Sequence, residues 1–282
     1  MNKILTQSDF KLTEKEIANG IHHHHDTINK DRKEILGDKF KIGSGIFVIN
    51  HDEKNNLNLS KKEIEIIKPS YTTKEIFRYY ANPNNKEWVI YTDSKFKNIQ
   101  EILQYPNIKK HLDQFKEVIT SDNKPYGLHR ARDEYFFKGE KIIAVRKCAK
   151  PTFSYTDFDC YASATFYVMK SERISMMYLT ALLNSKLMEF WLKHKGKMQG
   201  NNYQLDKEPL LGLPLKKPSA EDQKIIVKLF EQILTPAKSN KYVSNEDTQS
   251  KIKRIEKEID QLVYKLYELT PEEIKIVEGF GK

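Results

Sequence analysis

Apolar residues recur along this chain in two rhythms, one typical of helices and one of strands. Residues 178–192 carry Leu, Phe and Trp at three- and four-residue steps, which predicts an amphipathic helix. Short β-branched and aromatic runs predict strands at 88–92, 141–146 and 161–169. Because helices and strands alternate without a regular βαβ rhythm, we expect an α+β fold with a mixed, mostly antiparallel sheet.

The pattern changes after residue 218. Residues 220–234 predict one helix, and 236–245 predict a linker. Apolar residues between 252 and 269 then step by three and four, which is the a/d seam of a helix that packs on another helix. The helix at 220–234 is one possible partner for this seam. We therefore expect an α+β domain with an N-terminal arm over 1–218 and a C-terminal helical region over 219–282.

Composition narrows the class of protein. The chain has 282 residues and is 39% hydrophobic, enough for one large packed domain or two smaller ones. No apolar run approaches the ~20 residues of a membrane span, and the N-terminus lacks the apolar centre of a signal peptide. The two cysteines, Cys148 and Cys160, are too few for a disulfide scaffold. We expect reduced thiols and a cytoplasmic protein that does not contact membranes.

The net charge of +9 favours a polyanionic partner, and its distribution sharpens that expectation. Residues 246–282 carry seven basic and nine acidic side chains, so residues 1–245 hold +11. Within them, residues 124–150 alone carry eight Lys and Arg against three acidic residues. The basic surface is therefore expected in the first region and not in the C-terminal helices.

The segment after the helix at 178–192 is basic and rich in amides. Asn and Gln side chains can bond adenine through two hydrogen bonds, and Lys can bond phosphate or guanine. A polar loop between a helix and a strand has the same composition, so both interpretations stay open. The candidate DNA-binding residues here are Lys197, Gln199, Asn201, Asn202 and Gln204.

Four consecutive histidines, His22, His23, His24 and His25, lie inside the chain and are followed by Asp26. Adjacent side chains diverge in direction, which argues against one metal ion held by all four. A polar loop that contacts nucleic acid and a solvated loop are the other two interpretations.

Further basic clusters extend the candidate DNA-binding set. Phosphate contacts contribute affinity, while arginine contacts to base edges contribute specificity. Each cluster alone is compatible with a solvated surface, but together they favour nucleic-acid binding. We assign to base or backbone contact Arg130, Arg132, Arg146 and Lys147, and to phosphate contact Thr72, Lys74, Arg78, Lys95 and Lys97.

Catalytic motifs are absent from the sequence. There is no P-loop, nucleophile elbow, CxxC or HExxH motif, and no Asn/Asp-Pro-Pro-aromatic tetrapeptide of an amino-methyltransferase. Gly43-Ser44-Gly45 is a weak match to a cofactor loop, because a β-branched run follows it and predicts a strand. The carboxylate pairs at 63–65 and 157–159 are expected by chance in a chain that is 31% charged. We expect a binding module with no catalytic residues and no metal site.

Motifs over most of the chain resemble the target-recognition region of type IIG restriction-modification enzymes, the TaqI-like C-terminal specificity domain. A half of a type I specificity subunit is distantly similar. The segments that carry the resemblance are GIHHHHD (20–26), GIFVI (45–49), IIKPSYTTKEIFRYY (66–80), WVIYT (88–92), YPNIKKHLDQF (105–115), ITSDNKPYGLHRAR (119–132), KIIAVRKC (141–148), LLNSKLMEFW (182–191), KGKMQGNNYQLDKEPLLGLPL (195–215) and IDQLVYKLYELTPEEIKIV (259–277).

This resemblance implies an α+β fold with one face against double-stranded DNA. In the family, the whole enzyme methylates the exocyclic amine of adenine with S-adenosylmethionine and often cleaves DNA with Mg²⁺. The methyltransferase and endonuclease parts lie N-terminal to this region. We therefore expect this chain to be a fragment or a separately encoded specificity chain, without its own enzymatic activity or cofactor. On this interpretation the four histidines belong to the protein, and we assign His22, His23, His24 and His25 to the DNA groove or to the junction with the methyltransferase.

Two hypotheses from other classes remain open. One is a divergent S-adenosylmethionine-dependent methyltransferase that uses Gly43–Gly45, and the other is a protein-interaction scaffold whose seam at 252–269 matters most. The recognised bases depend on which side chains face the DNA groove, and the sequence does not determine this.

Overall fold

The computed structural model describes residues 1–239 and 245–280. A five-stranded sheet lies at its centre, in the order β1-β10-β6-β8-β4. All of its neighbours are antiparallel except β4 and β8, which run parallel. The strands are β1 (Ile17–Asn19), β10 (Phe166–Met169), β6 (Lys141–Val145), β8 (Phe153–Thr156) and β4 (Tyr79–Tyr80).

Two smaller sheets flank the central one. The four-stranded sheet has the order β2-β5-β3-β9, and the three-stranded sheet has the order β11-β12-β7. Their strands are β2 (Val48–Asn50), β5 (Glu87–Ile90), β3 (Ile67–Tyr71) and β9 (Tyr161–Ala162), then β11 (Lys197–Gln199), β12 (Asn202–Gln204) and β7 (Lys147–Cys148). Only β3 and β9 are parallel within these two sheets. The predicted α+β class with mostly antiparallel pairing is confirmed.

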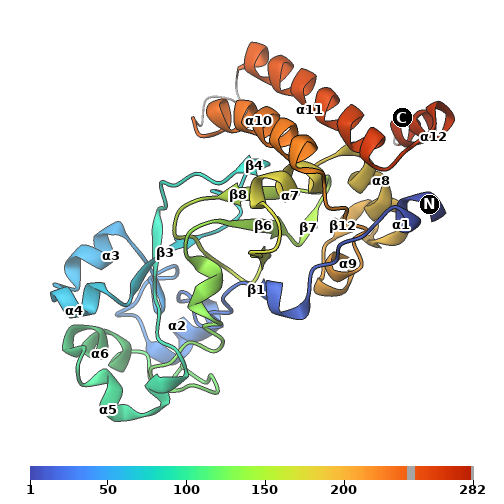
Figure 1. Cartoon of the computed structure of the whole chain (residues 1–282). Coiled ribbons are helices and arrows are strands. Elements are labelled where there is room, and N and C mark those ends of the chain that lie inside the picture. Colours follow the sequence, from blue (N-terminus) through green and yellow to red (C-terminus); the bar gives the residue numbers. More distant parts are fainter. Residues whose placement is uncertain (240–244, 281–282) are drawn as a thin grey trace.

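Helices surround the sheets (Figure 1). Those of the first half are short, and the longest ones close the C-terminal end. They are α1 (Asn2–Thr6), α2 (Lys30–Leu36), α3 (His51–Asn56), α4 (Lys61–Ile64), α5 (Ile99–Ile102), α6 (Pro106–Asp113), α7 (Met176–Leu183), α8 (Lys186–Lys195), α9 (Lys207–Leu211), α10 (Ala220–Ala237), α11 (Glu246–Leu266) and α12 (Pro271–Gly279). Short 3-10 turns are η1 (Glu14–Glu16), η2 (Ser94–Lys97) and η3 (Glu134–Phe137).

The central sheet is buried on both faces, because side chains of alternate residues enter different hydrophobic clusters. Ile142 and Ala144 of β6 pack into the cluster that contains α7, α8, α10 and α11. Ile143, between them, packs into the cluster built around the four-stranded sheet and α6. The sheet therefore separates two cores and fixes the position of one relative to the other.

The C-terminal helices join the first of these cores. Ile252, Ile255 and Ile259 of α11 are buried together with Phe230 and Ile233 of α10. The predicted packing of the 252–269 seam on the preceding helix is confirmed. The cluster runs across the boundary predicted at residue 218, since α7 and α8 belong to it as well. Of the predicted linker, residues 240–244 lie outside the described residues.

Two predicted elements are each divided in the structure. The helix expected over 178–192 is α7 and α8, separated at Asn184-Ser185. The Asn184 side chain there exchanges hydrogen bonds with the backbone of Phe153 on β8 at 2.7 and 3.3 Å, and Ser185 caps α8. The strand expected over 161–169 is β9 and β10, which belong to different sheets and are joined by a turn at 163–165.

The glycine turn at Gly43–Gly45 leads into the strand β2, as its β-branched run predicted. No helix within the described residues has the length and apolar character needed to cross a membrane. Both cysteines are free thiols.

Candidate nucleic-acid interface

Two segments far apart in the sequence pair at the centre of a basic surface. His22 and Arg130 form an antiparallel bridge, in which each backbone N–H donates to the other residue's carbonyl, at 3.1 and 3.2 Å. The bridge brings the four-histidine loop alongside the segment from His129 to Arg132. Two clusters that the sequence suggested separately therefore form one site.

Arg132 is held in an uncommon backbone conformation. Its φ of +70° lies in the left-handed region, which costs an L-residue ~1–2 kcal/mol. The Tyr91 hydroxyl donates a 2.8 Å hydrogen bond to the Arg132 carbonyl and stabilises this conformation. Burial and the charge of the neighbouring Arg130 both lower the pKa of Arg132. Such strain at a positively charged pair is typical of a functional site.

Neither Arg130 nor Arg132 forms an ion pair within residues 1–239 and 245–280. The Arg130 side chain is exposed, and the Nε atom of Arg132 is buried without a hydrogen-bond partner. An unpaired buried donor normally costs ~1–3 kcal/mol. The exposed Arg130 guanidinium is therefore a cationic donor group that the described part of the chain leaves unused, and the half-buried Arg132 lies two positions from it.

Histidine rings surround these arginines. The ring of His129 lies 5.0 Å from that of His22 and 5.2 Å from that of His24, and the rings of His24 and His25 are 4.3 Å apart. Burial lowers the pKa of His23 to about 4, and burial together with the nearby His24 and Arg32 lowers that of His25 to about 4. These two imidazoles are neutral near pH 7, so each has one donor and one acceptor nitrogen.

The contacts of the histidines in this structure are with protein groups. Among the residues that the structure describes, no three His, Cys, Asp or Glu side chains come together in a set that could hold a metal ion. Instead, the His25 Nε2 atom lies 3.3 Å from the Thr120 hydroxyl, and the His23 Nε2 atom is buried without a partner.

The turn at 163–165 connects this centre to Arg146. Gly20 packs so closely on the turn that a Cβ atom would lie 1.9 Å from the Ser163 carbonyl oxygen, which requires glycine. On the other side of the turn, the Nη1 of Arg146 donates to the Ala164 carbonyl at 3.2 Å. The guanidinium of Arg146 also lies over the Tyr167 ring, 5.2 Å from its centroid. Arg146 is thus held at two points beside the His22–Arg130 bridge.

The amide-rich segment forms the hairpin of β11 and β12. Gln199 pairs with Asn202 across a turn made by Gly200, with φ +59°, and Asn201. Asn201 and Gln199 are exposed, whereas Tyr203 is buried and fixes the hairpin to the core. Gln204 pairs with Lys147 of β7, so the hairpin extends directly from the strand after Arg146.

The Asp206 carboxylate contacts three donor side chains beside the β11–β12 hairpin. Asp206 Oδ1 lies 3.0 Å from the Nη2 of Arg146, while its Oδ2 accepts from Gln204 Nε2 at 2.6 Å and from Lys197 Nζ at 3.3 Å. Burial alone would raise the pKa of Asp206, but the hydrogen bonds from Arg146, Gln204 and Lys197 outweigh it and hold the pKa below its usual value. Asp206 is therefore ionised near pH 7.

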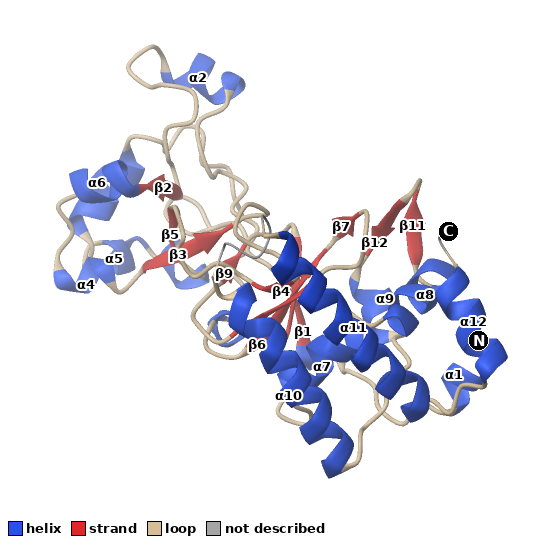
Figure 2. Ribbon diagram, turned by 90° about the horizontal axis from the view of Figure 1, so that it is seen from above, coloured by secondary structure: helices blue, strands red, loops and turns tan. Residues whose placement is uncertain are grey.

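These contacts link five segments, which together we call the basic face: residues 22–25, 129–132, 146–147, 163–165 and 197–204. Figure 2 shows the hairpin β11–β12 and the α2 segment projecting toward the same edge of the view, away from α10. Arg32 of α2 donates to the carbonyls of His24 and Thr27, which connects that segment to the histidine loop.

The residues expected at phosphates are distributed around this face. Thr72 lines a cavity of about 590 Å³ together with His22–His24 and Ser163–Thr165, and Lys74 is exposed nearby. The Thr72 hydroxyl itself donates to Glu75 at 2.8 Å. Lys95 and Lys97 are exposed on η2, which follows Thr92, and the Thr92 carbonyl accepts from the N–H of Leu128. The segment that precedes these two lysines is therefore hydrogen-bonded to the segment that leads into Arg130.

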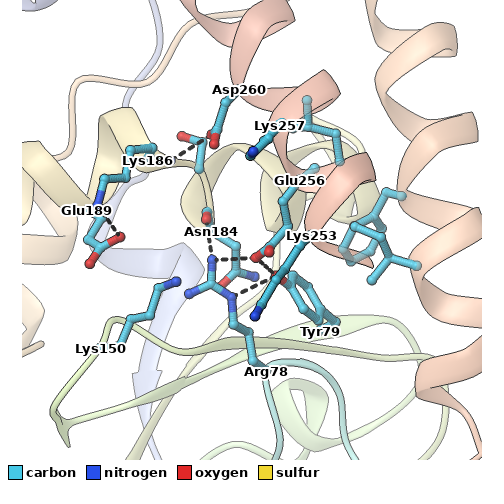
Figure 3. Close-up of a pocket in the computed structure, with 15 residues that line it drawn as sticks. Arg78, Tyr79, Lys150, Asn184, Lys186, Glu189, Lys253, Glu256, Lys257 and Asp260 are labelled. Atoms are coloured by element: carbon cyan, nitrogen blue, oxygen red, sulfur yellow. Dashed lines mark hydrogen bonds and ion pairs between the residues drawn. The ribbon is translucent and has the colours of Figure 1, made fainter. Parts of the chain in front are cut away.

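Arg78 is not brought to the basic face. Figure 3 shows its guanidinium in a pocket between α8, α11 and the end of β4, where the Nη2 donates to the Asn184 carbonyl at 2.6 Å and lies 3.3 Å from Glu256. Its Nε donates to the Tyr79 hydroxyl at 2.9 Å. Arg78 therefore connects the start of β4 to the junction of α7 and α8 and to α11. It does not lie on the surface where we expected it to contact phosphate.

The acidic pairs considered for metal chemistry have structural partners. Glu63 caps α4 and also accepts from the backbone N–H groups of Asn107 and Ile108 at the start of α6. Asp157 accepts from Tyr80 and Lys238. Asp206, in contrast, was not singled out in the sequence, and its role depends on contacts that only the fold brings together.

The model of the TaqI-like C-terminal specificity domain family matches residues 68–215, which is more than half of the chain. The chain belongs to this family. The matched region includes Arg130, Arg132, Arg146 and the β11–β12 hairpin, but starts after the histidine loop. The resemblance inferred from the sequence motifs is therefore confirmed.

Relatives of this specificity domain are longer proteins. The type II methyltransferases M.HindII and M.HincII of Haemophilus influenzae are each 29% identical to it over 132 residues, covering 41% of this chain. The match takes in 26% of each relative, so the matched part of this chain corresponds to about a quarter of their length. Among solved structures, the type IIL restriction-modification enzyme MmeI, in complex with DNA, shares the fold with a TM-score of 0.66 at 15% identity. That likeness covers 97% of this chain and 35% of MmeI.

Proposed function

We propose that this specificity domain reads the sequence of double-stranded DNA for a restriction-modification enzyme. The methyltransferase that modifies an adenine amino group and the endonuclease would lie outside these 282 residues, in the same protein or in a separate chain. Family membership supports this proposal, as do the methyltransferase relatives and the fold shared with an enzyme whose structure contains DNA.

The observation that carries the proposal is the unpaired arginine pair at the centre of the basic face. Arg130 and Arg132 have no carboxylate partner among the described residues, although Arg132 is in a strained conformation. A stable fold gains nothing from two adjacent unpaired cations, whereas a groove of DNA supplies acceptors for both. Arginine commonly bonds the O6 and N7 atoms of guanine through two hydrogen bonds.

The surrounding residues divide into two roles under this proposal. The exposed amides of Gln199 and Asn201, the half-buried amide of Asn202 and the exposed rings of His22 and His24 contact base edges through their hydrogen-bond donors and acceptors. Lys147 and Lys197, together with Lys74, Lys95 and Lys97, contact phosphates and supply affinity that depends on salt.

The cofactors belong to the other domains in this proposal. We assign S-adenosylmethionine and Mg²⁺ to the methyltransferase and endonuclease outside this chain, and cytoplasmic DNA is the substrate. Calorimetric titration of the 282-residue chain with S-adenosylmethionine is expected to give no saturable heat. Saturable binding would favour the alternative of a divergent methyltransferase.

A binding selection from a randomised duplex library tests the proposal. The chain should enrich a defined sequence, and the Arg130→Ala/Arg132→Ala double variant should lose ~1–3 kcal/mol of preference at the base pairs that these arginines read. The Lys224→Ala/Lys228→Ala variant is a matched control, because it removes two exposed charges from α10, away from the basic face. Equal enrichment by both double variants would contradict the assignment of the arginines.

A salt series distinguishes DNA reading from a protein-interaction scaffold. The logarithm of DNA affinity should fall linearly with the logarithm of salt concentration, with a slope set by the number of phosphates contacted. A chain that does not bind DNA at low salt would refute the proposed function.

A further inference from the structure

The Asp206 carboxylate is directed away from the helix whose first turn it would be expected to cap. Asp206 is the N-cap residue of α9, where an Asp side chain normally accepts a backbone N–H of the first turn and stabilises the helix. No such hydrogen bond is present, and the carboxylate is directed to Arg146, Gln204 and Lys197. The helix α9 therefore lacks the stabilisation of a side-chain cap, and the carboxylate instead fixes the positions of three side chains of the basic face.

The carboxylate determines which atoms of these side chains remain available. The Nη2 of Arg146 is bound to Asp206 and its Nη1 to the Ala164 carbonyl, so the Nε–H and one further N–H on each Nη can still donate. The Gln204 Nε2 donates to Asp206, which leaves the Gln204 carbonyl oxygen as an acceptor. The result is a fixed cationic donor group beside a fixed neutral acceptor.

We propose that Asp206 is a specificity-determining positioning residue, which fixes the Arg146 guanidinium and the Gln204 amide so that they read adjacent base edges in duplex DNA. This inference rests on the proposed function. The donors held in this way suit the guanine O6 and N7 acceptors, and the Gln204 oxygen suits the exocyclic amine of adenine or cytosine. Asp206 itself contacts no base.

This positioning role predicts opposite effects on two properties of DNA binding: the affinity for DNA of any sequence and the discrimination between sequences. Asp206 places a negative charge at a surface that approaches phosphates, so it lowers affinity for DNA of any sequence. It also limits the rotamers of Arg146, so it raises discrimination between sequences. Asp206→Asn should therefore reduce preference about tenfold at one or two adjacent base pairs, and leave affinity for a non-cognate duplex unchanged or higher.

The experiment uses the full 282-residue chain, with fluorescence anisotropy on the selected duplex, its single-base variants and a non-cognate duplex. Glu208→Gln is the matched control, since it removes the same charge from an exposed residue of α9 that does not contact Arg146. A second test places Asp206→Asn in an Arg146→Ala background. There the substitution should have no further effect on preference at the base pair that Arg146 reads.

Three outcomes would overturn the inference. If Asp206→Asn and Glu208→Gln have the same base preference, the Asp206 carboxylate does not determine specificity. A parallel fall in cognate affinity, non-cognate affinity and melting temperature would assign Asp206 a structural role alone. A parent chain that binds DNA without any base preference would refute the proposed function, and this inference with it.

Discussion

The strained backbone at Arg132 makes a prediction whose sign is unusual. At most positions a glycine lowers the free energy of unfolding relative to alanine by ~0.5–1 kcal/mol, because it adds freedom to the unfolded chain. At Arg132, however, φ is +70°, a conformation that glycine adopts without the cost that a Cβ imposes. We therefore expect Arg132→Gly to be more stable than Arg132→Ala.

The magnitude follows from two opposing terms. The left-handed conformation costs an L-residue ~1–2 kcal/mol, and glycine is freed from this cost. The extra entropy of glycine in the unfolded chain takes back ~0.5–1 kcal/mol. Taken at the middle of both ranges, the difference leaves Arg132→Gly about 0.8 kcal/mol more stable than Arg132→Ala. Both variants lack the guanidinium, so the comparison isolates the backbone term from any lost packing of the arginine stem.

Urea unfolding measures this difference through the transition midpoint at constant m. Arg130 supplies the matched control, because its φ is not positive and Arg130→Gly should be less stable than Arg130→Ala. If glycine is the less stable substitution at both positions, the strain at Arg132 does not exist. Both Arg132 variants should still lose DNA preference, since strain and recognition reside in different atoms of one residue.

Two further predictions concern groups away from the arginine pair. Arg78→Ala should lower the free energy of unfolding by about 3 kcal/mol, because it leaves Glu256 and its other buried partners without the guanidinium. Lys74→Ala should leave stability unchanged and lower the slope of log DNA affinity against log salt concentration by about one. The reverse pattern would make Arg78 the phosphate contact. Stability should also decrease as pH falls from about 6.5 to 4, since His23 and His25 have folded pKa values of about 4 and protonate more readily when unfolded. Burial raises the pKa of Asp260 to about 6. This carboxyl group therefore binds its proton more readily in the folded state, which opposes the loss of stability at lower pH. Urea midpoints at pH 7 and pH 5 measure the net effect, and His25→Gln should reduce it; identical pH dependence in parent and variant would contradict the assignment.

Local patterns identified most of the regular elements. The runs at 88–92 and 141–146 became β5 and β6, and the stepped leucines and isoleucines of 220–269 became α10 and α11. These predictions succeeded because periodicity records which face of an element is buried, and that information is local. The divided elements failed for the opposite reason. Asn184 interrupts a helical pattern only because its amide reaches the backbone of β8.

Charge and residue type were sufficient to select the candidates for the basic face, but they did not separate its members from other cations. Arg78 and Arg130 are both arginines in basic, aromatic segments of the sequence. Only tertiary packing places Glu256 beside the first and, within residues 1–239 and 245–280, no carboxylate in an ion pair with the second. The partner of a charge is set by long-range contacts, 178 positions away in the case of Arg78, and no local pattern encodes it.

The sequence by itself determined the fold class, the family and the segments that carry cationic and amide side chains, because each is encoded in local periodicity, in residue type and in the order of motifs along the chain. The tertiary structure decided which of those segments meet. The His22–Arg130 bridge, the turn at 163–165 and the gathering of Arg146, Gln204 and Lys197 by Asp206 all join distant parts of the chain. Geometry at a site is a property of these long-range contacts, so the arrangement of the basic face appears only when the chain is folded.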